Sequence, residues 1–234
     1  MPQPQIGDML LTSRPMSDYR AMFALTDDDI RGRILDCPGG GAAFTAEAYA
    51  LGADSTAVDP VYNIAVDAFA QHMTAAMTHS REWIESAPDL FTWTTYPDVD
   101  ALLNARIAAI DISASDRAAR PDHYLAASLP DLPFANDYFD LTLSSHLVFC
   151  YADRFDADWH RAALAELLRV TNGDVRIYPI CDYTGMTPDW YDEVLADLVA
   201  KGVEHRYVEV SYQIIQNAQA MLVLRKTPHS RLTN

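Results

Sequence analysis

Apolar residues along the chain follow two spacings, one typical of buried strands and one typical of amphipathic helices. Short apolar runs predict strands at 33–37, 55–58, 123–128, 141–149, 174–180, 206–215 and 218–226. Apolar positions three or four residues apart predict helices at 42–52, 156–171 and 188–200. Strands that alternate with helices favour a doubly wound, mostly parallel α/β sheet of seven strands with helices on both faces. The last two strands are separated by only a few residues, so they predict a C-terminal antiparallel hairpin.

Two segments do not fit this alternation. Residues 62–122 are more than one crossover between parallel strands needs, and helical spacing near 64–77, 80–86 and 98–110 predicts a helical insertion after the second strand. Ahead of the first strand, apolar residues within 15–30 predict one or two short helices, in an N-terminal cap over about 8–31. Because no Gly/Ser/Pro-rich linker divides the 234 residues, we expect 1–234 to form a single domain.

Composition and charge narrow the class of partner. Half of the residues are hydrophobic and 21% are charged, as in soluble globular proteins. The 17 Lys and Arg residues against 33 Asp and Glu give a formal net charge of −16, which disfavours nucleic acid and anionic membranes as partners. We expect a cytoplasmic protein, because the sequence has neither a secretory signal pattern nor an apolar run long enough to cross a bilayer. No pattern indicates an oligomeric state.

A glycine-rich turn follows the first predicted strand and opens the next helix. Without Cβ atoms, Gly39, Gly40 and Gly41 let a ligand approach the backbone, and N–H groups at the start of a helix point at its negative part. Asp59 ends the next strand, where a carboxylate accepts hydrogen bonds from both hydroxyls of a ribose. Phe44 stands where a dinucleotide fingerprint has its third glycine. A nucleoside without a pyrophosphate therefore fits better than NAD.

Three runs of sequence resemble a known family. They are ILDCPGGGAAFTAEAYALGADSTAVDP, LPDLPFANDYFDLTLSSHLVF and ELLRVTNGDVRIYPI. In their order and spacing they resemble the Rossmann-like class I S-adenosylmethionine-dependent methyltransferases, over about residues 33–225. The resemblance implies S-adenosyl-L-methionine as cofactor and transfer of its methyl group to an acceptor. It also implies the closing antiparallel hairpin, and it places substrate recognition in the leading helices and the insertion.

The same resemblance assigns parts of the cofactor to residues of this chain. For the methionine portion it implies Asp36, Pro38, Gly39, Gly40 and Gly41. For the ribose it implies Asp59, with Pro60 beside it, and for the adenine it implies Ser128 and Leu129. The family commonly has an acidic residue at the place of Ser128, so here the adenine contact falls to the serine hydroxyl and the Leu129 N–H. Ser145 is placed near the reacting sulfonium, and Tyr19 in the leading helices is expected to close over the cofactor.

Methyl transfer from a sulfonium is an in-line displacement, and the acceptor atom must be unprotonated and held close behind the methyl group. A general base helps when the acceptor is a hydroxyl of high pKa, and His146 is the histidine that the resemblance places at the reaction centre. The alternative role for His146 is to satisfy backbone groups at the end of a strand. No HExxH pattern is present, and we expect no metal.

Other groups of residues have structural explanations. Asp27, Asp28 and Asp29 fit the solvated first turn of a helix. Three cysteines without CxxC spacing fit reduced core residues. A set of aromatic residues either lines an acceptor pocket or packs the insertion on the sheet: Tyr62, Phe69, Trp83, Phe91, Trp93 and Tyr96.

Three functions are therefore open at the level of sequence. The first is a methyltransferase acting on a small-molecule acceptor. The second is a non-catalytic regulatory protein of the same fold that binds a nucleoside or S-adenosylmethionine, because a fold does not fix a function. The third is an NAD-linked oxidoreductase, against which Phe44 counts.

Overall fold

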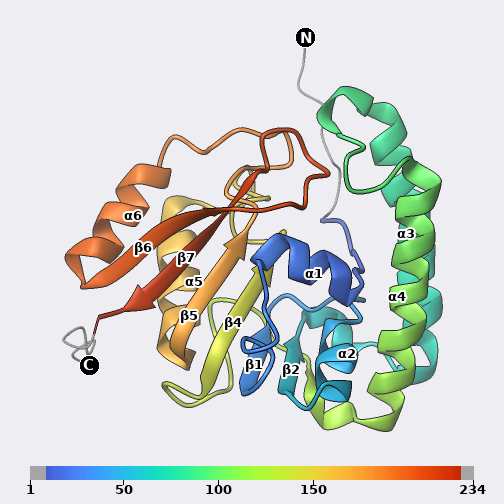
Figure 1. The fold of residues 1–234 in the computed structure, drawn as a ribbon, viewed down its shortest axis with the longest axis horizontal. Coiled ribbons are helices and arrows are strands. Elements are labelled where there is room, and N and C mark those ends of the chain that lie inside the picture. Colours follow the sequence, from blue (N-terminus) through green and yellow to red (C-terminus); the bar gives the residue numbers. More distant parts are fainter. Residues whose placement is uncertain (1–8, 228–234) are drawn as a thin grey trace.

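The computed structural model describes residues 9–227, and a seven-stranded sheet forms its centre (Figure 1). The strands are β1 (Arg33–Asp36), β2 (Asp54–Val58), β3 (Tyr124–Leu125), β4 (Phe139–Ser145), β5 (Thr171–Tyr178), β6 (Val203–Glu209) and β7 (Ala220–Lys226). Their order in the sheet is β3-β2-β1-β4-β5-β7-β6. The first five are parallel, and β7 runs antiparallel to both of its neighbours, β5 and β6. The predicted doubly wound α/β sheet with a closing antiparallel hairpin is confirmed.

Helices cover both faces of this sheet. They are α1 (Met16–Phe23), α2 (Phe44–Ala50), α3 (Val66–Ser86), α4 (Val99–Ala119), α5 (Ala157–Val170) and α6 (Tyr191–Ala200), with 3-10 turns η1 (Pro60–Asn63), η2 (Pro88–Leu90) and η3 (Pro121–His123). Neighbouring residues of β1 face opposite layers, since Ile34 packs with residues of α1 and α2 and Leu35 packs with residues of α5 and α6. A strand buried on both faces explains why β1 is apolar throughout its middle.

The insertion between β2 and β3 is a pair of long helices. In Figure 1, α3 and α4 lie side by side, on the side of the sheet where β2 lies. Phe69 and Met73 of α3 pack against Leu103 and Ile110 of α4 and against residues of β2 and β3. The Asp98 carboxylate accepts a 2.8 Å hydrogen bond from the Ala101 N–H and so caps α4. The helices expected at 64–77 and 80–86 are one continuous helix, and α4 extends further than its apolar spacing indicated.

Several predicted boundaries are wrong, and the causes are local. The third strand has only two residues, because β3 is an edge strand that pairs with β2 at Ala57 and Val58 alone. The fourth strand ends at Ser145 because His146 adopts a left-handed backbone conformation, with φ of 53°. Asp27, Asp28 and Asp29 lie in a turn between α1 and β1 and not in a helix. In this turn Asp29 forms an ion pair with Arg176. No helix in the described residues is long and apolar enough to span a membrane.

Candidate functional site

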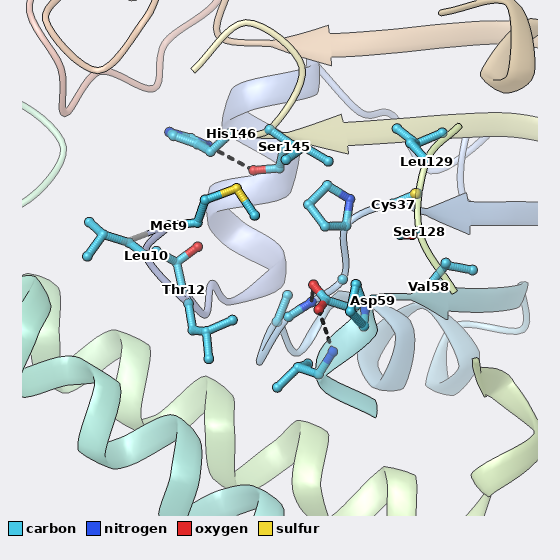
Figure 2. A pocket seen from close by; sticks show the side chains of 18 of the residues that line it. Met9, Leu10, Thr12, Cys37, Val58, Asp59, Ser128, Leu129, Ser145 and His146 are labelled. Atoms are coloured by element: carbon cyan, nitrogen blue, oxygen red, sulfur yellow. Dashed lines mark hydrogen bonds between the residues drawn. The ribbon is translucent and has the colours of Figure 1, made fainter. Parts of the chain in front are cut away.

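A cavity of about 520 Å³ opens at the carboxyl ends of β1, β2 and β4 (Figure 2). Open α/β sheets bind ligands at this edge, where the loops after several parallel strands converge. Most of the predicted site residues line the cavity: Tyr19, Pro38, Gly39, Gly40, Asp59, Pro60, Ser128, Leu129, Ser145 and His146. Asp36 and Gly41 do not line it. Pro38, Gly39 and Gly40 therefore share one hollow with the carboxylate of Asp59, as the resemblance implied.

Asp59 sits between the glycine-rich turn and η1. One carboxylate oxygen accepts from the Gly40 N–H and the other accepts from the Val61 N–H, each at 2.9 Å. Burial raises the pKa of the Asp59 carboxyl, although these two N–H donors favour the ionised form. An ionised carboxylate has about four acceptor positions, so roughly two remain for a ligand. One free position on each oxygen suits two neighbouring hydroxyl groups.

The N–H groups of the glycine-rich turn bond within the protein. Gly39 donates to the Val58 carbonyl at 3.0 Å, Gly41 donates to the Thr12 carbonyl at 3.0 Å, and Ala43 donates to the Arg14 carbonyl at 2.9 Å. The Gly40 N–H is already taken by Asp59. The expectation that these groups meet the negative part of a ligand is therefore wrong, because the end of β2 accepts from Gly39 and Gly40 and the chain before α1 accepts from Gly41 and Ala43.

The glycines are needed for close packing around the turn. A Cβ atom on Gly39 would lie 2.5 Å from the Tyr62 hydroxyl and 2.8 Å from the Ala57 Cβ. Gly40 has φ of +51°, and a Cβ there would lie 2.6 Å from the Thr12 carbonyl oxygen. The Tyr62 hydroxyl in turn donates to the Gly40 carbonyl at 2.9 Å. The turn is thus fixed in place, and it presents Pro38, Gly39 and Gly40 to the cavity.

Tyr19 and Asp36 form a buried pair behind the turn. The Tyr19 hydroxyl donates to the two carboxylate oxygens of Asp36 at 2.9 and 3.1 Å. Burial raises the pKa of Asp36 well above its ordinary value. The Tyr19 ring is 1% exposed and stacks on Phe44 at 4.6 Å between ring centroids. Tyr19 is therefore a buried part of the cavity wall, and Asp36 lies behind it without lining the cavity.

Ser145 and His146 lie across the cavity from Asp59, as Figure 2 shows. The Ser145 Oγ and the His146 Nδ1 are 2.9 Å apart, and the His146 N–H donates to the Tyr178 carbonyl at 2.7 Å. Burial, together with the charges of Arg14 and Arg106, holds the pKa of His146 well below 6.5. The imidazole is thus neutral at physiological pH, and it carries one unprotonated nitrogen.

The N-terminal segment closes one side of the cavity, and its residues 9–12 fall within the predicted cap but are not helical. Met9, Leu10 and Thr12 flank the hollow in Figure 2, on the opposite side from Leu129 and Val58. The Leu10 N–H donates to the Tyr151 hydroxyl at 2.9 Å, which ties the segment to the loop after β4. These residues show no hydrophobic periodicity. The hydrogen bond between Thr12 and Gly41 uses backbone atoms alone, so it does not depend on the residue type at position 12.

Ser128 and Leu129 reach the cavity from the loop after β3, and both are labelled in Figure 2. Leu129 is buried and Ser128 is exposed at the rim. Phe44 and Phe149 are core residues, and the three cysteines are buried and unpaired, as expected for the cysteines. Within residues 9–227, His, Cys, Asp and Glu side chains form no group of three that could hold a metal ion.

Comparisons with known proteins give distant similarities. No family model matches the chain. The uncharacterized protein MJ0045 from Methanocaldococcus jannaschii is 23% identical over 222 residues, which cover 94% of this chain and 98% of that protein.

Among solved structures, the N-methyltransferase NodS from Bradyrhizobium japonicum aligns with a TM-score of 0.44 and 14% identity, over 91% of this chain and 93% of NodS. A SAM-dependent methyltransferase from Methanosarcina mazei aligns with a TM-score of 0.41 and 10% identity, over 84% and 92% of the two chains. The [4+2]-cyclase SpnF aligns with a TM-score of 0.40 and 12% identity, over 84% and 74%. At these values the likeness assigns no activity to this chain.

Proposed function

We propose that the protein is an S-adenosylmethionine-dependent methyltransferase that acts on a small molecule. The observation that carries the proposal is the arrangement of one cavity, in which Asp59 at the end of β2 faces Ser145 and His146 at the end of β4, with β1 between these two strands. Its volume of about 520 Å³ is within the range of sites for small ligands and cofactors. Residues from the first two runs that resemble the methyltransferase family, among them Gly39, Asp59 and Ser145, line this same cavity.

The hydrogen-bonding groups around the cavity fit a nucleoside better than a dinucleotide. The free acceptor positions of Asp59 suit the two hydroxyls of a ribose, and Ser128 with Leu129 offers a place for the adenine. A pyrophosphate needs free N–H groups at the glycine-rich turn, and those of Gly39, Gly40 and Gly41 bond within the protein. This counts against an NAD-linked oxidoreductase.

When bound, S-adenosylmethionine supplies an electrophilic methyl group next to a sulfonium. In our proposal Asp59 binds the ribose, and the apolar segment at Met9 and Leu10 excludes water from the reaction centre. The neutral His146 takes the proton that the acceptor loses as it gains the methyl group. Ser145 orients the imidazole through the contact at Nδ1.

Calorimetric titration and a turnover assay test the proposal together. S-adenosylhomocysteine should bind the wild type, and NAD should not. Incubation of the protein with S-adenosylmethionine and cell extract should yield a species heavier by one CH₂. In His146→Asn, turnover should fall by about 10²–10⁴-fold while the Kd for S-adenosylhomocysteine changes less than about twofold.

Asparagine is chosen at position 146 because it tolerates the left-handed backbone conformation of this residue. Wild-type turnover in this variant would return His146 to a structural role. Binding of S-adenosylhomocysteine without any turnover would favour the non-catalytic binding protein, and tight binding of NAD alone would overturn the proposal.

A further inference from the structure

A second, smaller cavity of about 60 Å³ adjoins the first. Leu10, Arg14, His146 and Tyr151 are among the residues that line both cavities, so the two are neighbours and His146 stands between them. Since a water molecule needs roughly 10–15 Å³ of such space, the smaller cavity has room for a group the size of a carboxylate. The indole and phenyl rings of Trp83 and Phe91 form part of its wall.

Three polar side chains on the wall of this smaller cavity have atoms with no hydrogen-bond partner. They are the Nε of Arg14, the Nε of Arg106 and the Oγ of Ser80. Their residues are 5%, 6% and 0% exposed, respectively. They come from separate elements, since Arg14 precedes α1, Ser80 lies on α3 and Arg106 lies on α4. Buried donors without a partner are rare in proteins, and here they share one small hollow.

The charges at this place are also unbalanced. Within residues 9–227, neither Arg14 nor Arg106 forms an ion pair, and the Nη1 of Arg14 donates to the Thr12 hydroxyl at 2.7 Å. Burial and the charge of Arg14 lower the pKa of Arg106 to about 10, which leaves it a cation at physiological pH. Asp18 is the nearby acidic group, and one of its oxygens accepts from the Tyr96 hydroxyl at 2.7 Å. Two cations and one anion leave a net positive charge.

We infer that this smaller cavity is an anion subsite, in which Arg106, Arg14 and Ser80 hold a carboxylate of the methyl acceptor. The inference rests on the proposed function and narrows it to acidic acceptors. Arginine is suited to this task because its planar fork of donors matches a carboxylate. An acceptor anchored there extends past His146 toward the first cavity, where the methyl donor is proposed to bind.

A carboxylate held at this place has a second conceivable source, because the methionine portion of the cofactor also carries one. The positions of the residues favour the acceptor. Ser80 and Arg106 line the smaller cavity alone, whereas Arg14 lines both cavities. The test therefore measures cofactor and acceptor separately.

The probe is phenylacetate, with phenylacetamide as its neutral counterpart, titrated calorimetrically into the protein saturated with S-adenosylhomocysteine. Phenylacetate should bind, and phenylacetamide should bind at least tenfold more weakly. Arg106→Met should weaken phenylacetate binding at least tenfold, and Ser80→Ala several-fold. Both variants should bind S-adenosylhomocysteine as the wild type does.

Arg117→Met is the matched control. Arg117 is also a buried arginine of α4, but its Nη2 donates to the carbonyls of Tyr62 and Ile64 at 2.6 Å each. Its loss should lower the urea midpoint and leave phenylacetate binding unchanged. Arg106→Met should keep or raise the urea midpoint, because it removes a buried charge that forms no ion pair with a described residue.

Several results would overturn the inference. They are the absence of phenylacetate binding to the wild type, equal binding of the amide, or unchanged phenylacetate binding in Arg106→Met. Weaker binding of S-adenosylhomocysteine in that variant, with 5′-methylthioadenosine binding unaffected, would assign the subsite to the cofactor instead. A failure of S-adenosylhomocysteine to bind the wild type would refute the proposed function, and phenylacetate titrated into the free protein would then still test the subsite.

Discussion

Replacement of Asp59 by asparagine tests both the packing of the glycine-rich turn and the proposed binding of the ribose. The carboxylate accepts from the Gly40 and Val61 N–H groups with separate oxygens, and asparagine keeps only one oxygen. Its NH₂ group must then face one of these two backbone donors. A buried N–H without an acceptor costs about 1–3 kcal/mol, and urea unfolding should show a loss of that size in the free energy of unfolding.

The loss of ligand affinity should be larger than that from removing two hydrogen bonds between neutral groups, because the Asp59 carboxylate is charged. Each hydrogen bond from a ribose hydroxyl to an ionised carboxylate is worth about 1.5–3 kcal/mol, and water replaces part of this in the variant. A net loss of about 2–4 kcal/mol corresponds to a Kd for S-adenosylhomocysteine that is about 30- to 700-fold weaker. Calorimetry at a temperature where the variant is folded measures this change.

Asp174→Asn provides the matched control. Asp174 is a buried aspartate of β5 that accepts from Arg206 and Arg225, and it does not line the first cavity. Its replacement should lower the free energy of unfolding and leave the affinity for S-adenosylhomocysteine as it is. If Asp59→Asn binds S-adenosylhomocysteine as tightly as the wild type, the assignment of the ribose to Asp59 is refuted.

Three further changes test the packing and electrostatics of the site. Gly39→Ala should lower the free energy of unfolding by about 1–3 kcal/mol, because its Cβ would lie 2.5 Å from the Tyr62 hydroxyl. In a Tyr62→Phe background the same substitution should cost less, and equal costs in urea unfolding would contradict this. Tyr19→Phe leaves the buried Asp36 carboxyl without its side-chain donor and should cost about 1–3 kcal/mol in the same assay, whereas an unchanged midpoint would show that the bond is worth little. Burial holds the pKa of His146 well below 6.5, so as pH falls below about 6.5 the unfolded chain binds a proton that the folded protein does not, and stability is lost. His146→Asn should therefore lose less stability than the wild type between about pH 7 and pH 5.5 in urea titrations, and parallel losses would place the histidine pKa near its ordinary value.

The sheet and one side of the site were predictable because they depend on sequence patterns within short segments of the chain. Asp36, the glycine-rich turn and Asp59 follow strand ends in sequence, and parallel neighbours bring such ends to one edge. The resemblance to the methyltransferase family placed Ser145 and His146 at the same edge, and the pairing of β4 with β1 brings them there.

The other side of the site depends on contacts between distant segments. Ser80 and Arg106 are single polar residues within 21-residue helices, and helical spacing does not tell which of them faces a cavity. The role of Thr12 rests on its backbone carbonyl, which any residue type provides. The backbone conformation of His146 is imposed by tertiary structure, because histidine has no local need for φ of 53°.

The most direct test of the central claim is a crystal structure of the wild type grown with S-adenosylhomocysteine. We predict one molecule in the cavity of about 520 Å³, with both ribose hydroxyls within hydrogen-bond distance of the Asp59 carboxylate and the sulfur on the side of Ser145 and His146. A molecule bound elsewhere, or a ribose turned away from Asp59 in this cavity, would contradict it.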